Sequence, residues 1–180
     1  SSEEIVPLQP DLVIAGAYTT RMTRAVLKRL DIPVLELGVA SSIDEVMQQI
    51  ERVAAALGTR ERGAQLIADI TERLAALPPA PQVADQPLAA IYQPNGFTLG
   101  RGSLVNDLMH RAGVRNLAVE RRIDHYGSLP LESLLLAQPD LLIMNAADDR
   151  APALAYEILQ HPALIRRYSA RVISIPSAWW

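Results

Sequence analysis

Cysteine is absent from this 180-residue chain. Its absence excludes disulfide bonds, thiol catalysis and cysteine-ligated zinc, and leaves the cellular compartment open. Histidine is scarce as well: only His110, His125 and His161 are present, and no two of them are four residues apart. Because helical zinc sites place two histidines at that spacing, a resident metal centre is not expected.

Long apolar runs and a strong net charge are also missing. No stretch approaches the roughly 20 apolar residues that a membrane-spanning helix needs. Hydrophobic residues nevertheless make up 49% of the chain, which is enough to bury a core. The net charge is -3 and there is no basic run. This pattern argues against nucleic acid as the main partner.

Known catalytic and phosphate-binding motifs are not met. Gly96, Gly100 and Gly102 precede a predicted helix, but they match neither the dinucleotide fingerprint G-x-G-x-x-G nor a P-loop, which requires a lysine. Two interpretations stay open: a flexible glycine loop, or a loop that approaches a ligand closely with Arg101 as an anion contact. No serine lies in a G-x-S-x-G elbow, and Asp148, half of an Asp-Asp pair, fits a helix start better than catalysis.

One phrase occurs twice. QPDLVIAGA at residues 9–17 returns as QPDLLIMNA at residues 138–146, and seven of fifteen positions are identical between residues 3–17 and 132–146. Pro-Asp is a turn signal, and the short apolar run behind it is typical of a strand buried on both faces. Each copy therefore predicts helix, turn, buried strand, loop and helix, which is the order of elements in a parallel α/β sheet.

The remaining pattern continues this alternation. Ser42 and Glu45 predict a capping box ahead of an amphipathic helix that Gly58 ends. A second, longer helix is predicted from Thr59 to Leu77, followed by a proline-rich, extended connector. Further strands are expected at residues 33–37, 88–92, 116–119 and 171–175, and further helices at 21–30, 103–112 and between 152 and 168. We therefore predict an α/β fold of two Rossmann-like lobes with parallel sheets, residues 1–58 and 80–180, joined by one long helix at 59–79.

Six of the eight aromatic residues lie at predicted strand ends or in the loops that follow them. In open parallel sheets, ligands bind outside the carboxyl ends of the strands. These positions therefore predict a cleft lined by aromatic side chains, unless the rings pack on their own lobe. The candidate ligand-binding residues are Tyr18, Tyr92, Asn95, Phe97, Arg101, Tyr126, Asp148 and Trp179.

Five stretches together resemble the periplasmic substrate-binding proteins of ABC transporters that import ferric siderophores and cobalamin. They are SSEEIVPLQPDLVIAG, SIDEVMQQIERVAAALGTRERGAQLIADITERL, GRGSLVNDLMHRAGVRNLA, YGSLPLESLLLAQPDLLIM and RVISIPSAWW, and they cover nearly the whole chain. The resemblance implies two lobes bridged by a helix, with the ligand between them. Tyr18, Trp179 and the loop after Tyr92 match positions where members often contact ligand. Members are usually longer at both ends, so the chain is expected to be truncated.

The resemblance implies a ligand-capture protein without a catalytic step. Its ligand would be a metal chelate such as a ferric siderophore, cobalamin or haem. Its protein partner would be the membrane permease of an ABC importer, and its location would be the periplasm or a lipid anchor outside the cytoplasmic membrane. The acidic docking residue that members carry on the first lobe is not found near Arg21 or Met22. The alternative is a two-lobed α/β enzyme acting on a cofactor or nucleotide-sugar.

Overall fold

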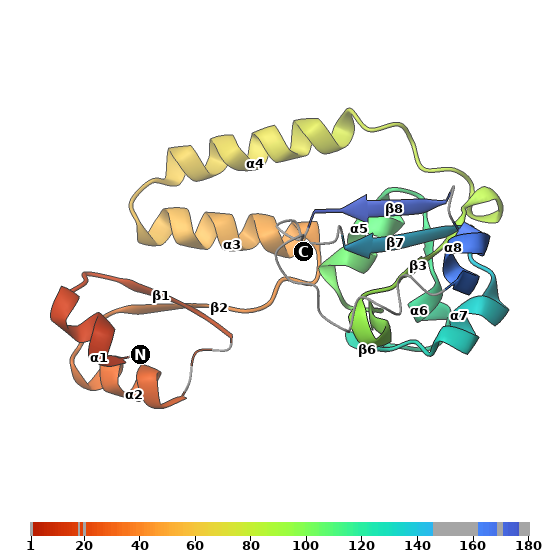
Figure 1. Cartoon of the computed structure of the whole chain (residues 1–180). Coiled ribbons are helices and arrows are strands. Elements are labelled where there is room, and N and C mark those ends of the chain that lie inside the picture. Colours follow the sequence, from red (N-terminus) through yellow and green to blue (C-terminus); the bar gives the residue numbers. More distant parts are fainter. Residues whose placement is uncertain (1, 18, 20, 146–161, 169–170, 177–180) are drawn as a thin grey trace. The chain divides into compact units, whose positions relative to one another are not determined.

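The computed structural model describes residues 2–17, 19, 21–145, 162–168 and 171–176. The chain divides into two compact units, residues 1–77 and 78–180. Each is described by itself below. Both are α/β with parallel sheets, as the sequence predicts (Figure 1).

The N-terminal unit is built on a two-stranded parallel sheet. The strands are β1 (Val13–Gly16) and β2 (Val34–Leu37), paired with Val13 opposite Val34. The helices are α1 (Ser2–Ile5), η1 (Val6–Leu8), α2 (Arg21–Arg29), α3 (Ile43–Ala56) and α4 (Arg60–Ala75). The helices predicted at 21–30 and 59–77 are thus confirmed as helices. The bridging role of the second stays a prediction, because the division of the chain groups α4 with the N-terminal unit.

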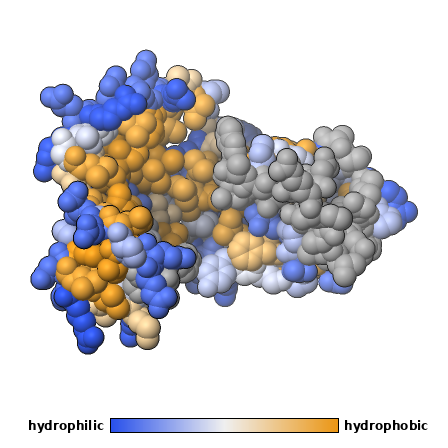
Figure 2. Space-filling view, turned by 60° about the vertical axis from the view of Figure 1, so that its left-hand side comes forward, coloured by the Kyte–Doolittle hydropathy of each residue, from blue (hydrophilic) through white to orange (hydrophobic). Residues whose placement is uncertain are grey.

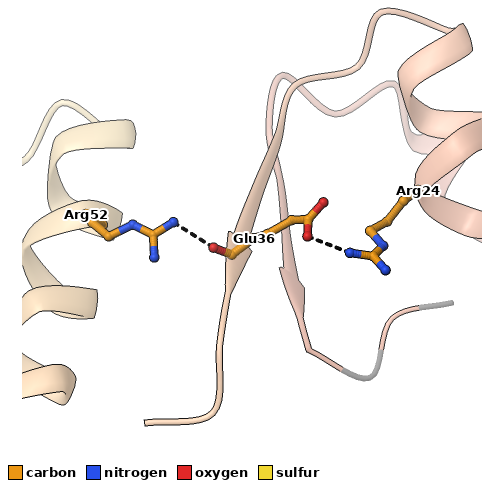
Figure 3. Close-up of polar contacts among 3 residues, drawn as sticks. All are labelled: Arg24, Glu36 and Arg52. Atoms are coloured by element: carbon orange, nitrogen blue, oxygen red, sulfur yellow. Dashed lines mark hydrogen bonds and ion pairs between the residues drawn. The ribbon is translucent and has the colours of Figure 1, made fainter. Parts of the chain in front are cut away.

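Glu36 on β2 links both neighbouring helices (Figure 3). The Arg24 guanidinium on α2 donates to the Glu36 carboxylate at 2.6 Å, and Arg52 on α3 donates to the Glu36 carbonyl oxygen at 2.7 Å. Because Glu36 and Arg52 are exposed and Arg24 is partly exposed, solvent screens these contacts and each contributes little to stability. Their effect is to fix the positions of α2 and α3 on the strand.

The predicted cap of α3 is confirmed, with one difference. The Ser42 hydroxyl accepts the Glu45 N–H at 3.2 Å, as in a capping box. The Glu45 carboxylate, however, accepts from the N–H and the hydroxyl of Ser41, at 2.7 and 3.0 Å. The N–H of Ser41 and then its hydroxyl hold the pKa of Glu45 below its usual value. The box therefore closes one residue earlier than its usual pattern.

Helices α3 and α4 pack closely as an antiparallel pair (Figure 1). A Cβ atom at Gly63 would lie 2.4 Å from the Ala54 Cβ, so glycine is needed at this crossing. Beside the crossing lies an apolar hollow of about 360 Å³, lined mainly by Leu37, Val46, Ile50, Val53, Ala54 and Leu66. Figure 2 shows apolar residues (orange) gathered on this unit.

The C-terminal unit holds a four-stranded parallel sheet in the order β5-β3-β7-β8. These strands are β5 (Arg115–Asn116), β3 (Leu88–Ile91), β7 (Leu141–Asn145) and β8 (Val172–Ile175). A separate antiparallel ribbon consists of β4 (Phe97–Leu99) and β6 (Tyr126–Ser128). The helices are η2 (Val83–Asp85), η3 (Pro94–Gly96), α5 (Leu104–Arg111), α6 (Leu117–Glu120), α7 (Leu131–Ala137) and α8 (Pro162–Tyr168).

The core of this unit lies against β3 and β7. Ala90, Leu117, Leu134 and Leu142 are almost completely buried in one cluster. The strand predicted at 116–119 is wrong beyond its first residue: β5 ends at Asn116, whose side-chain oxygen accepts the Ala118 N–H at 3.0 Å and starts α6. An asparagine cap of this kind favours a helix over a continued strand. The helix expected from 152 is seen as α8, and residues 152–161 lie outside the described part.

The repeated phrase has the same local structure in both copies. Gln9 and Gln138 both end a helical turn in the left-handed conformation, with φ of 45° and 48°. In the second copy, Asp140 then pairs with the start of β3: its carboxylate accepts the Leu88 N–H at 2.9 Å and its own N–H donates to the Leu88 carbonyl at 2.7 Å. The repeated phrase thus ends a helical turn in each unit, and a strand of the parallel sheet follows it.

Candidate functional site

The candidate site lies on the ribbon of β4 and β6 in the C-terminal unit. The two strands pair antiparallel, with Phe97 opposite Ser128 and Leu99 opposite Tyr126. Thr98 of β4 is completely buried, whereas Phe97 directly before it is exposed. The ribbon therefore has one face on the unit and the other toward solvent, as expected for a strand whose side chains alternate.

Two predicted site residues meet on this ribbon. The rings of Phe97 and Tyr126 stack with their centroids 6.2 Å apart and their planes 24° from parallel. They lie diagonally across the strand pair, where aromatic side chains can reach each other. Phe97 is 37% exposed and Tyr126 is 70% exposed. The pair thus offers an aromatic surface to solvent instead of filling the core.

Asn95 stands at the turn that leads into β4. It adopts a left-handed conformation with φ of 60°, which asparagine tolerates better than most residues. Its carbonyl oxygen accepts a hydrogen bond of 3.5 Å from the Ser128 hydroxyl. Gly96 follows at φ 73° against the Leu129 carbonyl, where a Cβ would lie 2.6 Å from that oxygen. This turn fixes Asn95 beside the strand pair, with its side chain exposed.

Arg101 follows the other end of β4. Its N–H donates to the Ile123 carbonyl at 3.0 Å, and the Gly100 N–H donates to the His125 carbonyl at 3.2 Å. A Cβ at Gly100 would lie 1.9 Å from the Ile123 oxygen. Glycine is therefore required here because two backbone segments nearly touch. This explains the glycine-rich sequence by packing within the unit, while the Arg101 side chain stays exposed.

Asn116 is a positioning residue that the sequence analysis missed. It is 5% exposed, and its side-chain amide donates to the Leu99 carbonyl at 2.9 Å and to the Asn106 side-chain oxygen at 3.1 Å. It therefore ties the end of β4 to α5 and α6. An asparagine just before an apolar helical stretch was the only available signal, and it indicated a cap without its long-range partners.

Tyr92 does not fit the prediction of an aromatic surface. It is completely buried in the core cluster next to Leu117 and Leu134. Its hydroxyl has no hydrogen-bond partner in the described part of the chain. Burial, with a smaller contribution from Glu132, raises the pKa of Tyr92. In this conformation no face of the ring is open to a ligand, and Tyr92 is a core residue of the C-terminal unit.

Tyr18, Asp148 and Trp179 lie outside the described residues. Within the described ranges, no group of three or more histidine, cysteine or acidic side chains could hold a metal ion. In the same ranges, no helix has the length and apolar character needed to span a membrane.

The structure thus presents a fixed aromatic pair with polar groups at its margins. Such a surface suits a ligand that has its own apolar or conjugated face, oriented by a few polar contacts. The combination of parallel α/β units and an exposed aromatic site is typical of a ligand-binding protein.

Comparison with known proteins identifies the family to which this chain belongs. Residues 1–167 match the family described as "Periplasmic binding protein". The match covers most of the sequence, and the chain belongs to this family.

The names of individual relatives refer to different ligands. A cobalamin-binding protein of Halobacterium salinarum is 26% identical over 171 residues, covering 93% of this chain and 46% of the relative. The chain therefore spans less than half the length of that protein. The apo structure of the periplasmic heme-binding protein RhuT from Roseiflexus sp. RS-1 is similar with a TM-score of 0.78 and 26% identity, covering 99% of this chain and 72% of that one.

A third similarity widens the range of named ligands. The structure named for an ABC-type Fe3+-hydroxamate transport system from Saccharomonospora viridis has a TM-score of 0.72 and 25% identity. The similarity covers 99% of this chain and 65% of the chain from Saccharomonospora viridis. Family membership is thus established, while the named ligands of the relatives differ from one another.

Proposed function

We propose that this chain is part of the substrate-binding component of an ABC importer and that its ligand is a metal chelate: a ferric siderophore, cobalamin or haem. The observation that carries the proposal is the stacked and exposed pair of Phe97 and Tyr126. The three ligand classes named for its relatives all present a large, partly apolar surface to a protein. An aromatic platform binds such a surface with little loss of conformational freedom.

The binding step requires no bond to be made or broken in the ligand. Phe97 and Tyr126 would cover an apolar face of the chelate, and Asn95 and Arg101 at the two ends of β4 would contact its polar groups. Because aromatic and arginine side chains dominate binding energy in most interfaces, this set is suited to capture. Tyr18, Asp148 and Trp179 remain proposed contacts from other segments.

The partner and location follow from the same proposal. The membrane permease of an ABC importer would receive the ligand, and the protein would act in the periplasm or from a lipid anchor outside the cytoplasmic membrane. The ligand would lie between two lobes, with α4 as the helix that joins them. A helical joint would allow smaller lobe movements than the loop hinges of other binding proteins.

A titration of the full chain with a chelate panel tests the proposal. Haemin, cyanocobalamin and ferrichrome are added separately, and binding is followed by absorbance and by the melting temperature. A ligand that binds only the folded state raises the free energy of unfolding by about 2.7 kcal/mol at a hundredfold excess over Kd. We expect at least one chelate to do so, and free zinc or manganese ions to have no such effect. A panel without any binder would contradict the proposal.

A further inference from the structure

The only Asn-Gly pair in the sequence lies in the turn that precedes β4. Asn95 is exposed, and Gly96 directly after it is buried. In such a pair the backbone nitrogen of the glycine can attack the side-chain amide of the asparagine, because glycine has no side chain to block the approach. The other asparagines, Asn106, Asn116 and Asn145, precede aspartate, leucine and alanine. Asn95 is therefore the asparagine with the greatest intrinsic tendency to deamidate.

This reaction needs only water and a proton acceptor from the solvent. The Gly96 nitrogen gives up its proton and bonds to the side-chain carbonyl carbon (Cγ) of Asn95. The bond from that carbon to the side-chain nitrogen breaks, and ammonia leaves. Water then opens the resulting cyclic imide at either of its carbonyl carbons. The product is aspartate or isoaspartate, in which the backbone runs through the former side chain, and each adds a negative charge to the turn.

The folded turn holds the reacting atoms of Asn95 and Gly96 apart. Ring closure requires the Gly96 nitrogen and the Asn95 Cβ to be eclipsed about the Cα–C bond, which tetrahedral geometry places at a ψ of about −120°. Asn95 instead has φ of 60° and ψ of 21°. Its ψ must therefore rotate by about 140° before the bond can form. In the folded turn the nitrogen faces away from the side chain that it would attack.

Backbone hydrogen bonds on both sides of the pair oppose that rotation. The Gly96 N–H donates to the Gln93 carbonyl at 3.0 Å, and the Gln93 N–H donates to the Phe97 carbonyl at 2.9 Å. The Leu129 N–H donates to the Gly96 carbonyl at 2.8 Å. The first of these bonds also occupies the proton that the Gly96 nitrogen must lose. Deamidation of Asn95 therefore requires this turn to open locally.

We propose that Asn95–Gly96 is a deamidation site that is closed while the turn before β4 is folded and reacts when this turn opens. The site is independent of the proposed function, although it adjoins Phe97 of the aromatic pair. The two products differ in their fit. Aspartate tolerates the left-handed conformation at this position, whereas isoaspartate lengthens the backbone between Gln93 and Phe97, which are hydrogen-bonded to each other.

The rate of deamidation in the folded and the unfolded chain tests the proposal. The full chain is incubated without ligand in mildly alkaline buffer, with and without guanidinium chloride, and peptide mapping by mass spectrometry follows each asparagine. In the unfolded chain we expect Asn95 to react first. In the folded chain we expect Asn95 to react at least about tenfold more slowly, because opening of the turn must break the backbone hydrogen bonds of Gly96.

A substitution before the pair separates the effect of the turn from the intrinsic chemistry. Pro94→Gly leaves Gly96 in place, so the rate in guanidinium chloride should stay the same. It increases the freedom of the opened turn, and the rate at Asn95 in the folded chain should therefore rise about twofold to fivefold. Pro79→Gly is the matched control, since Pro79 is exposed in the connector outside this turn. This control should leave the rate at Asn95 unchanged in both states.

A second measurement concerns the products. The two forms are separated by chromatography, and their melting temperatures are compared with those of the wild type and of Asn95→Asp. The aspartate form and Asn95→Asp should melt near the wild-type temperature, and the isoaspartate form should melt lower.

Three results would overturn the proposal. They are equal rates at Asn95 in the folded and unfolded chains, equal rates in the folded wild type and folded Pro94→Gly, and faster reaction of another asparagine in the unfolded chain. None of these measurements uses a ligand, so their failure and that of the proposed function are distinguishable.

Discussion

Two sets of aromatic residues in the C-terminal unit have opposite surroundings. Tyr92 and Tyr168 are 0% and 1% exposed and belong to the core cluster. Phe97 and Tyr126 are 37% and 70% exposed and stack on each other. All four residue positions lie at or near the ends of secondary-structure elements. Proximity to a strand end therefore does not decide whether an aromatic ring faces a ligand.

The difference follows from the position of each strand. Tyr92 directly follows β3, which pairs with β5 on one side and β7 on the other, and its N–H donates to the Ile143 carbonyl of β7 at 2.9 Å. Its ring is thus enclosed by neighbouring elements. Phe97 and Tyr126 belong to a ribbon of only two strands, β4 and β6. One face of such a ribbon stays open to solvent, and large side chains there are available for binding.

The largest expected contrast is in stability. Tyr92→Ala should lower the free energy of unfolding by about 4 kcal/mol, since it leaves a large cavity in the core. Tyr126→Ala should lower it by less than about 1 kcal/mol, because most of that ring is already exposed. Urea unfolding of both variants, followed by circular dichroism, gives the two values. Equal losses would mean that the two rings do not have different structural roles.

A smaller effect concerns the Tyr92 hydroxyl. Because this buried group has no partner among the described residues, Tyr92→Phe should raise the free energy of unfolding by about 1 kcal/mol at neutral pH. Binding of a chelate should not change, since the ring stays in place. A clear loss of stability in Tyr92→Phe would reveal a hydrogen bond of that hydroxyl.

The same substitution should alter the alkaline limit of stability. An unfolded tyrosine ionises near pH 10, whereas burial raises the pKa of folded Tyr92. The wild-type protein therefore loses stability as the pH rises above about 10 towards the raised pKa, because the unfolded state releases its proton first. Tyr92→Phe should lose less stability over this range. Parallel slopes of unfolding free energy against pH in the two proteins would contradict a buried, protonated Tyr92.

The smallest effect is the coupling between the two exposed rings. A double-mutant cycle of Phe97→Ala and Tyr126→Ala should give a coupling of about 0.5–1 kcal/mol in the free energy of unfolding. The cycle is measured without ligand, so that it reports the stack alone. Additive losses would indicate that the rings are neighbours without a stabilising contact.

Much of this fold could be predicted from the sequence because its signals are local. Pro-Asp followed by an apolar run predicted β1 and β7, and Ser42 predicted the start of α3. The ribbon was missed because a three-residue strand such as β4 has no periodic pattern, and its partner lies beyond α5 and α6. The stretch after β5 was misassigned because Asn116 acts through long-range hydrogen bonds.

The candidate site could be predicted from the sequence only in part. Residue type and placement after strands singled out Phe97 and Tyr126, but the same criterion included Tyr92. Sequence could not separate them, because burial depends on which strands lie on either side. The contact between the loop after β4 and the loop before β6 was missed, because only backbone hydrogen bonds between residues remote in sequence hold these loops together.

The central claim is that the exposed rings of Phe97 and Tyr126, and not the buried rings of Tyr92 and Tyr168, bind a chelate. The most direct test is the affinity of the Phe97→Ala/Tyr126→Ala variant for the chelate that the wild-type chain binds best, with Leu136→Ala as control, since Leu136 of α7 is an 81% exposed apolar residue outside the site. We predict a loss of at least about 2 kcal/mol in binding free energy for the double variant, roughly thirtyfold in Kd, and none for the control. A double variant that folds and binds with wild-type affinity would contradict the account.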